Sequence, residues 1–222
     1  MSDSLSGDVK LYINGTLANE FTQLKLDAIM QPMFYMQFSN TSSQKIAGQM
    51  DEFYYFKEYA LTSTDVTALN NGGKGAFWSP ATGGGGSHWS ANSGTLDLLD
   101  SHMPVVYKFE SGALTTDSKG SNNLTASATP PTSVIGGMDG NCVNFARTLP
   151  GQSMWLNTSG DFNSPNKFSI STWLKWMPLG TGIWVQSTGS LIWSIEISSN
   201  RIRFTIVTGI DLYAVEGDYI SA

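Results

Sequence analysis

Apolar and polar residues alternate along much of this chain, and the first clear case is the segment 7–15, which reads GDVKLYING. Val9, Leu11 and Ile13 occupy every second position, as in a strand with one buried face. The Asn-Gly dipeptide at 14–15 follows them and favours a type I′ turn, which needs two residues at positive φ. The pattern therefore predicts a strand that opens a β-hairpin.

Strands of similar character are expected on both sides of a glycine-rich stretch. Before it, the segments 34–38 and 49–58 are rich in aromatic residues and have strong strand character. The later strands are expected at 105–110, 142–146, 153–157, 168–176, 182–187, 190–198, 201–207 and 211–215. Together they predict an all-β fold with antiparallel sheets packed face to face as a sandwich.

One short surface helix is expected over 62–70. Thr62 and Asp65 have the spacing of a capping box, in which each side chain bonds the other residue's backbone N–H. The glycines at 72–73 can end the helix, because glycine readily adopts the left-handed conformation of a helix C-terminus. No other segment has helical periodicity.

Residues 79–102 form the glycine-rich stretch and are expected to be a linker. Four consecutive glycines, Gly83 to Gly86, lose too much backbone entropy to hold a strand or a helix. The run GGGGS also resembles a linker used in protein engineering, so a natural and an engineered origin both stay open.

The residues on either side of this linker resemble a laminin-G-like, concanavalin A-like jelly roll. The segments VVYKFESGALTTDSKGSNNLTAS, GMDGNCVNFARTLPGQSMWLN and FSISTWLKW resemble the opening half of that family. GDVKLYINGTL, FYMQFSN and IAGQMDEFYYFKEYALTSTDVTALNNGG resemble its closing half. The resemblance thus implies a closing half at 1–78, a linker at 79–102 and an opening half at 103–222, which together make one domain.

The order of the two halves is reversed relative to the family. Either the chain is one circularly permuted sandwich, or it is a window that covers the end of one tandem repeat and the start of the next. In the family, the two ends that the 79–102 segment would join lie close together. The linker is therefore long enough under both interpretations.

One strand of the family, with a sequence of the type WHHVA, has no counterpart here. A strand missing from a sheet leaves unpaired N–H and C=O groups, which can pair with another chain. We therefore expect Val9, Leu11 and Ile13 to lie at an edge that accepts a β-strand. The strand would come from a partner, or from a second copy in a strand-exchanged homodimer.

Composition and charge narrow the possible functions. The chain has 222 residues and a net charge of −6, which disfavours nucleic acid because phosphate binding needs clustered Lys and Arg. No apolar run is long enough to span a membrane, and the first residues lack the pattern of a secretory signal. The single cysteine, Cys142, is expected to be buried in a strand. The resemblance implies a recognition module at an extracellular, bacterial or phage surface, where it binds glycan or protein.

Catalysis is not expected. Both histidines, His88 and His102, fall in or beside the linker, so no triad contains a structured histidine. The glucanases related to this family carry alternating acidic residues on one strand face. Here Asp51 and Glu52 are adjacent, which places them on opposite faces of their strand, and Glu196 stands alone. A glucanase-type activity is the least supported alternative.

Calcium is the ion that the resemblance implies, since relatives hold it with oxygen ligands between the loop after the first strand and the last strand. The matching positions are Asp117, Asn122, Asn123 and Asp51. The alternative is that Asp117 and Asn122 are turn residues that bond their own backbone, and that Asp51 caps loop amides. Both interpretations stay open at this stage.

Aromatic residues are the other candidates for ligand contacts. Flat rings stack on the apolar faces of sugars, and the chain has seven tryptophans. Most strand tryptophans are expected in the core. Trp155, Trp176, Trp184 and Tyr54 remain as candidates for a sugar-binding surface. Tyr54 and Tyr55 should point to opposite sides of their strand.

Overall fold

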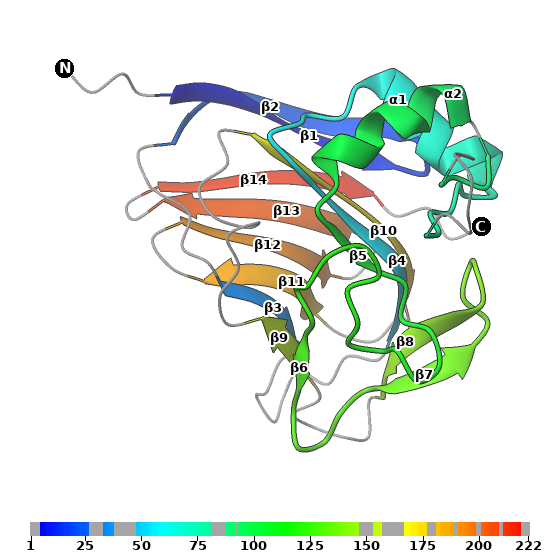
Figure 1. Ribbon diagram of the computed structural model, residues 1–222. Helices are drawn as coiled ribbons and strands as arrows, with labels where there is room; N and C mark the ends of the chain where they lie inside the picture. Colours follow the sequence, from blue (N-terminus) through cyan, green and yellow to red (C-terminus); the bar gives the residue numbers. More distant parts are fainter. Residues whose placement is uncertain are drawn as a thin grey trace.

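Two curled antiparallel sheets make up most of the computed structural model of this protein (Figure 1). The structure describes residues 5–26, 33–37, 48–80, 88–91, 93–146, 153–156, 167–176, 181–188, 191–198, 201–208 and 211–218. Every ladder between the described strands is antiparallel. The prediction of an all-β fold is confirmed.

The larger sheet has seven strands and the smaller one has five. In spatial order, the larger sheet consists of β14 (Asp211–Asp218), β13 (Arg201–Thr208), β12 (Leu191–Ser198), β11 (Thr181–Thr188), β3 (Met33–Gln37), β9 (Ser153–Leu156) and β6 (Thr125–Ala126). The smaller sheet has the order β10 (Phe168–Trp176), β4 (Gly48–Lys57), β8 (Asn141–Phe145) and β7 (Thr132–Ile135), with β5 (Val105–Tyr107) also paired to β4.

A separate two-stranded sheet is formed by β1 (Leu5–Ile13) and β2 (Thr16–Leu26). Their turn is the predicted one, with Asn14 at φ 51° and Gly15 at φ 79° between the paired residues Ile13 and Thr16. The hairpin lies beside β14 at the top of Figure 1 without a ladder to it. Side chains join the two instead, since a Cβ added at Gly217 of β14 would lie 2.6 Å from Ile13 Cδ1.

Strands from both sides of the glycine-rich stretch share the two larger sheets. β4 pairs with β10 on one side and with β5 and β8 on the other. Its register with β5 aligns Phe53 with Tyr107 and Tyr55 with Val105. A strand from before the glycine-rich stretch thus forms a ladder with one from after it. β3 likewise lies between β11 and β9 in the larger sheet.

Two apolar clusters cover the two faces of the five-stranded sheet. The inner cluster lies between the sheets and consists of Met50, Phe53, Tyr55, Val105, Tyr107, Phe109, Leu124, Val143, Phe145 and Met154. The outer cluster lies under the helices and consists of Tyr54, Phe56, Ala68, Leu69, Ala76, Trp78, Trp89, Leu96, Leu99, Met103 and Val106. β4 contributes to both clusters, so Tyr54 and Tyr55 point to opposite sides, as predicted.

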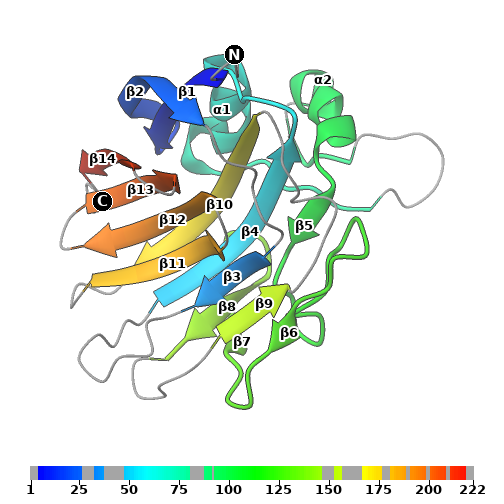
Figure 2. The same cartoon turned by 90° about the vertical axis from the view of Figure 1, so that its left-hand side faces the viewer.

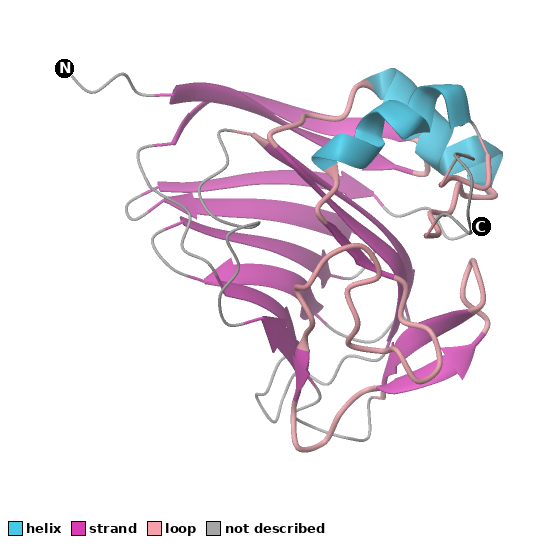
Figure 3. Ribbon diagram, viewed as in Figure 1, coloured by secondary structure: helices cyan, strands magenta, loops and turns pink. Residues whose placement is uncertain are grey.

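The helices gather on this outer face, as Figures 2 and 3 show. α1 (Ser63–Asn70) has the predicted capping box, because the Thr62 side chain accepts from the backbone of Asp65 and the Asp65 side chain from that of Thr62. Its C-cap residue is Asn71, which has φ 46° and begins the 3-10 turn η1 (Asn71–Gly73).

A second helical segment lies within the stretch expected to be a linker. α2 (Ser93–Leu96) continues into the 3-10 helix η2 (Asp97–His102), so the prediction of one helix is wrong. Leu96 and Leu99 are both 0% exposed in the outer cluster. Their spacing of three residues places them on one side of a helix, a signal that the glycine- and serine-rich composition obscured.

The start of the same stretch is also part of the fold. Trp78 and Trp89 form an isolated antiparallel bridge and are both buried. Ser79 N–H donates to the His88 carbonyl at 2.8 Å, and Ser90 N–H donates to the Phe77 carbonyl at the same distance. Residues 81–87, which include the four glycines, lie outside the described residues. The described residues 88–91 and 93–102 therefore belong to the packed structure.

Candidate functional site

A β-bulge in β4 brings two buried acids to the same face of the five-stranded sheet. The register with β10 shifts between Ser171 and Trp173, so Glu52 and Phe53 together face a single residue of that strand. Met50 and Phe53 both point into the inner cluster although they are three residues apart. One residue between them is therefore extra, and that residue is Glu52, which has φ 49°.

The bulge overturns the expectation that Asp51 and Glu52 lie on opposite faces. Strand alternation predicts that arrangement only for a regular strand, and the extra residue turns both carboxyl groups to the outer side. Asp51 Oδ2 accepts from Asp139 N–H at 3.2 Å. Glu52 Oε1 lies 3.5 Å from Lys108 Nζ, which in turn binds Asp139 Oδ2 at 3.0 Å. Both acids are thus linked to Asp139, Asp51 by a hydrogen bond from its backbone and Glu52 through Lys108.

Glu52 is 0% exposed, and its carboxyl oxygens contact one hydroxyl and one ammonium group. The Tyr54 hydroxyl donates a hydrogen bond to Oε2. Oε1 has the Lys108 contact but no hydrogen bond. Burial raises the pKa of Glu52 to about 8, although the Lys108 charge and the Tyr54 hydrogen bond lower it. The carboxyl group is therefore mainly protonated at neutral pH.

Lys108 links Glu52 to Asp139. Its ammonium group also donates to the carbonyl of Trp78 at 3.1 Å, so three oxygen atoms surround it. Burial lowers the pKa of Lys108, but the charges of Glu52 and Asp139 outweigh burial and raise it overall. Its two neighbours, Tyr107 and Phe109, lie in the inner cluster, and alternation along the chain directs Lys108 to the other side. Its partners come from distant segments and leave no mark in the local sequence.

Asp51 holds the turn between β7 and β8. Its Oδ2 accepts from the backbone N–H of Met138 at 2.6 Å as well as from that of Asp139, and its Oδ1 accepts from Glu52 N–H at 2.9 Å. Burial raises the pKa of Asp51 to about 6, although these three amides lower it. A Cβ at Gly137 would lie 2.5 Å from Asp51 Oδ2, so only glycine fits there. This is the loop-capping role that the sequence left open for Asp51.

The other candidate calcium ligands lie together in a closed turn. The Asp117 carboxylate accepts from Val106 N–H, Lys119 N–H and both the backbone and the side-chain amide of Asn122, at 3.0–3.1 Å. Asn123 Oδ1 accepts from Asp117 N–H at 2.9 Å. These bonds match the turn interpretation, while Asp51 is bound to a different loop. No group of three or more His, Cys, Asp or Glu side chains in the described part of the chain could hold a metal ion.

Of the four candidate sugar-binding aromatic side chains, the structure describes only that of Tyr54. Tyr54 is 1% exposed and packs edge-on against Trp89, so it offers no surface to a ligand. The side chains of Trp155, Trp176 and Trp184 lie outside the described residues. Trp78 is also buried and donates from Nε1 to Asp100 Oδ1 at 2.7 Å.

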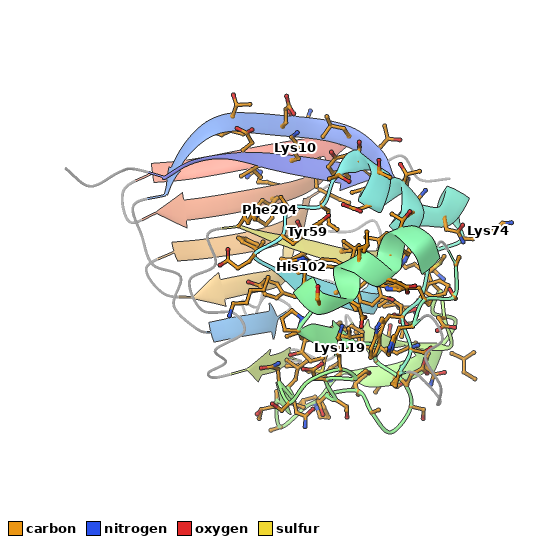
Figure 4. The ribbon with its side chains drawn as sticks, turned by 45° about the horizontal axis from the view of Figure 1, so that its top comes forward. Lys10, Tyr59, Lys74, His102, Lys119 and Phe204 are labelled. Carbon is orange, nitrogen blue, oxygen red and sulfur yellow. The ribbon has the colours of Figure 1, made fainter. Side chains whose placement is uncertain are left out.

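Both histidines pack on aromatic rings. The His88 ring stacks on Trp78 with a centroid distance of 5.6 Å. His102, at the end of η2, lies against Tyr59 at 4.7 Å, and Figure 4 shows the two side chains next to each other on the helical side. Their neighbours are residues of the outer cluster and its rim. Cys142 is buried as expected, and burial raises the pKa of its thiol.

The predicted strand-acceptor residues lie on a strand that is paired on one side only. Among the described strands, β1 pairs with β2 alone and β10 pairs with β4 alone. Val9, Leu11 and Ile13 of β1 are half-buried, as are Ile170 and Leu174 of β10. Val9, Ile170 and Leu174 also pack against the inner cluster. β4, which is paired on both sides, is by contrast almost entirely buried.

Comparisons with protein-family models, with curated proteins and with solved structures found no match to this chain. Within the described residues, no helix has the length and hydropathy needed to cross a bilayer.

Proposed function

We propose that this chain is a non-catalytic recognition module of the laminin-G-like, concanavalin A-like type, a jelly-roll sandwich with its two halves in permuted order. Two observations support the proposal: the segments that resemble the family, and the sheets that combine strands from both halves. Modules of this type act at extracellular, bacterial or phage surfaces, and that is where we place this one. Its partner is a protein or a glycan.

The proposal gives Asp51 and Glu52 no catalytic role toward polysaccharides, because both acids are used for structure. A general acid or base must reach its substrate within hydrogen-bond distance. Glu52 has no exposed surface, and Asp51 is bound by three backbone amides. Replacing either residue is expected to change the stability of the fold. Neither the native chain nor these variants should hydrolyse polysaccharide.

The pair of one-sided strand edges is the observation that best supports a protein partner. Among the described strands, β1 and β10 each form a ladder on one side only, and both carry half-buried apolar side chains beside the inner cluster. A strand that paired with either edge would satisfy the backbone groups and cover these side chains. The module would then act as a structural or assembly unit that accepts a complementing β-strand.

A peptide that contains the alternating sequence Trp-His-His-Val-Ala tests strand acceptance. Ligands that bind only the folded state raise its melting temperature, so we expect a rise of several degrees at saturating peptide. Leu11→Lys places a charge on β1 and should abolish the rise. Leu17→Lys, at an exposed position of β2 in the same hairpin, is the matched control and should keep it. An equal rise with a scrambled peptide would contradict the proposal.

Glycan binding and calcium are tested separately. A glycan-array signal that Trp155→Ala, Trp176→Ala or Trp184→Ala removes would identify a sugar ligand in place of a strand. Calcium remains an expectation drawn from the family resemblance, and a melting temperature that EDTA leaves unchanged would contradict it. Sedimentation of the free chain distinguishes a monomer from a strand-exchanged homodimer.

A further inference from the structure

Three side chains with complementary chemistry meet beside the turn between β7 and β8. The ammonium nitrogen of Lys108 lies 3.0 Å from Asp139 Oδ2 and 3.5 Å from Glu52 Oε1. Glu52 is 0% exposed, and its Oε1 has no hydrogen bond although the Lys108 nitrogen is near. An amine, a carboxyl group and a second, buried carboxyl group that can transfer protons are the parts that amide formation needs.

The backbone is strained on both segments that supply the amine and the buried acid. Glu52 has φ 49°, and Phe109, which follows Lys108, has φ 57°. Residues other than glycine rarely adopt a positive φ, and for a bulky residue such as phenylalanine it is a clear outlier. Strained residues of this kind cluster at functional sites. The two outliers therefore favour a chemical role for the contact between Glu52 and Lys108 over a plain ion pair.

Neighbouring contacts hold the amine and the carboxyl group in place. The Lys108 ammonium group donates to the Trp78 carbonyl at 3.1 Å, and the Asp139 N–H donates to Asp51 Oδ2 at 3.2 Å. Groups that are held at contact distance react with an effective concentration of roughly 10⁵–10⁸ M. This concentration far exceeds that of water, so condensation is favoured over hydrolysis of the product.

A second ion pair, between Lys119 and Asp100, provides a comparison. Lys119 Nζ lies 2.8 Å from Asp100 Oδ1. The same oxygen accepts from Trp78 Nε1 at 2.7 Å, and the Lys119 ammonium group lies 5.4 Å from the centre of the Trp78 ring. The indole stabilises both charges, because its N–H donates to the carboxylate and its ring attracts the cation. We therefore expect this pair to stay ionic.

We infer that Lys108 and Asp139 become joined by an amide bond, and that Glu52 is the catalytic residue of this reaction. The ammonium group first passes a proton to the Asp139 carboxylate. The neutral amine then attacks the carboxyl carbon, and Glu52 carries a proton from the nitrogen to the departing hydroxyl group. One C–N bond forms, one C–O bond breaks and one water molecule leaves, while Glu52 is regenerated. The Asp139 side chain is 44% exposed, which lets the water escape.

The bond goes beyond the proposed function, because the reaction runs once within each chain and acts on no external substrate. A reaction that occurs only once needs no more than a small fraction of neutral Lys108 at any moment. The product ties the segment after β5 to the turn between β7 and β8. A cross-link between distant residues stabilises a protein by restricting its unfolded chain.

Mass spectrometry of the intact native chain tests the inference directly. We expect a mass lower than that of the sequence by one water molecule and, after digestion, a branched peptide that joins Lys108 to Asp139. Lys108→Arg keeps the positive charge but removes the nucleophile, so it should have the full mass. Lys119→Arg, in the second ion pair, is the matched control and should still lose water. Asp139→Asn should lose ammonia in place of water and give the same product.

The role of Glu52 is tested by the rate at which the bond forms. In freshly synthesised protein, Glu52→Gln should slow the formation of linked chains at least about 100-fold, because the amide cannot carry the proton. Its near-ultraviolet circular dichroism should stay like that of the native chain. A slower rate in a variant that keeps the native spectrum distinguishes proton transfer from a merely structural role.

Three results would overturn the inference. The first is a native chain with the full mass of its sequence. The second is a loss of water that persists in Lys108→Arg, since the Asp139-Gly140 pair would then have closed into a cyclic imide. The third is linkage of Glu52→Gln at the native rate. None of these results affects the strand and glycan tests, so this inference and the proposed function can fail separately.

Discussion

At the scale of single residues, the acids of β4 show how one extra residue changes the chemistry of a strand. Glu52 has a positive φ of 49°, which few residues other than glycine adopt without strain. The bulge turns its carboxyl group away from the inner cluster and toward Lys108. Both the backbone conformation and the buried carboxyl group oppose folding. The contacts of Tyr54, Lys108 and the β7–β8 turn offset these costs.

The raised pKa values predict how stability depends on pH. Burial raises the pKa of Glu52 from 4.5 to about 8 and that of Asp51 from 3.8 to about 6. The folded chain thus binds protons more tightly than the unfolded chain. The stabilisation from these protons is complete below about pH 4 and is lost as the pH rises through 8. We expect the free energy of unfolding to fall between pH 6 and pH 8 by up to about 1.4 kcal/mol per pH unit for Glu52 alone.

Glu52→Gln isolates this contribution. The amide keeps an oxygen that can accept from Tyr54 but does not ionise, so the slope between pH 6 and pH 8 should flatten. Urea unfolding at several pH values measures the change. Glu20→Gln, at an exposed position of β2, is the control and should keep the native slope. A Glu52→Gln variant with an unchanged slope would show that Glu52 is not the titrating group.

At the scale of elements, the segment 93–102 acts as a core helix although its composition suggests a linker. Leu99 is 0% exposed and its neighbour Leu98 is 74% exposed. We expect Leu99→Ala to lower the free energy of unfolding by about 2–5 kcal/mol, because it leaves a cavity in the outer cluster. Leu98→Ala should change it by less than about 0.5 kcal/mol. Equal effects of the two substitutions, measured by urea unfolding, would contradict a packed helix.

The elements that the sequence predicts well are those that neighbouring residues determine. The Asn14-Gly15 turn and the Thr62–Asp65 capping box each depend on side chains within four positions, and both are confirmed. The β4 bulge depends on the register with β10, which lies more than a hundred residues away. Periodicity cannot reveal such a long-range constraint, so the faces of Asp51 and Glu52 were predicted wrongly.

The contacts of the candidate site were likewise predictable only where neighbouring residues determine them. The sequence correctly offered a turn around Asp117 and a loop-capping role for Asp51, because aspartate commonly bonds nearby amides. It gave no sign of the ion pair between Lys108 and Asp139, which are brought together only by the fold. It also assigned Trp89 to a linker, since the nearby glycines outweighed the tendency of large aromatics to be buried.

At the scale of the whole molecule, the described sheets depend on strands from both sides of the four glycines. β4 comes before the glycines and pairs with β5, β8 and β10, which all come after them. β3 lies between β9 and β11 in the same manner. Neither side alone can therefore complete the five-stranded sheet or the seven-stranded sheet. The inner cluster also combines residues from both, such as Phe53 and Phe145.

Cutting the chain between the two sides tests this interdependence. We expect a protease site inserted among Gly83 to Gly86 to be cleaved while the two fragments stay in one folded particle. The ladders of β3 and β4 and the shared inner cluster hold the fragments together without the covalent link. The cut should nevertheless lower the melting temperature, because separate fragments gain entropy when they unfold.

Light scattering should give the mass of the intact chain in native buffer, and two smaller masses only in denaturant. The uncut protein with the same insertion is the control. Fragments that separate in native buffer would show two independent units, and a particle of twice the mass would show a strand-exchanged dimer.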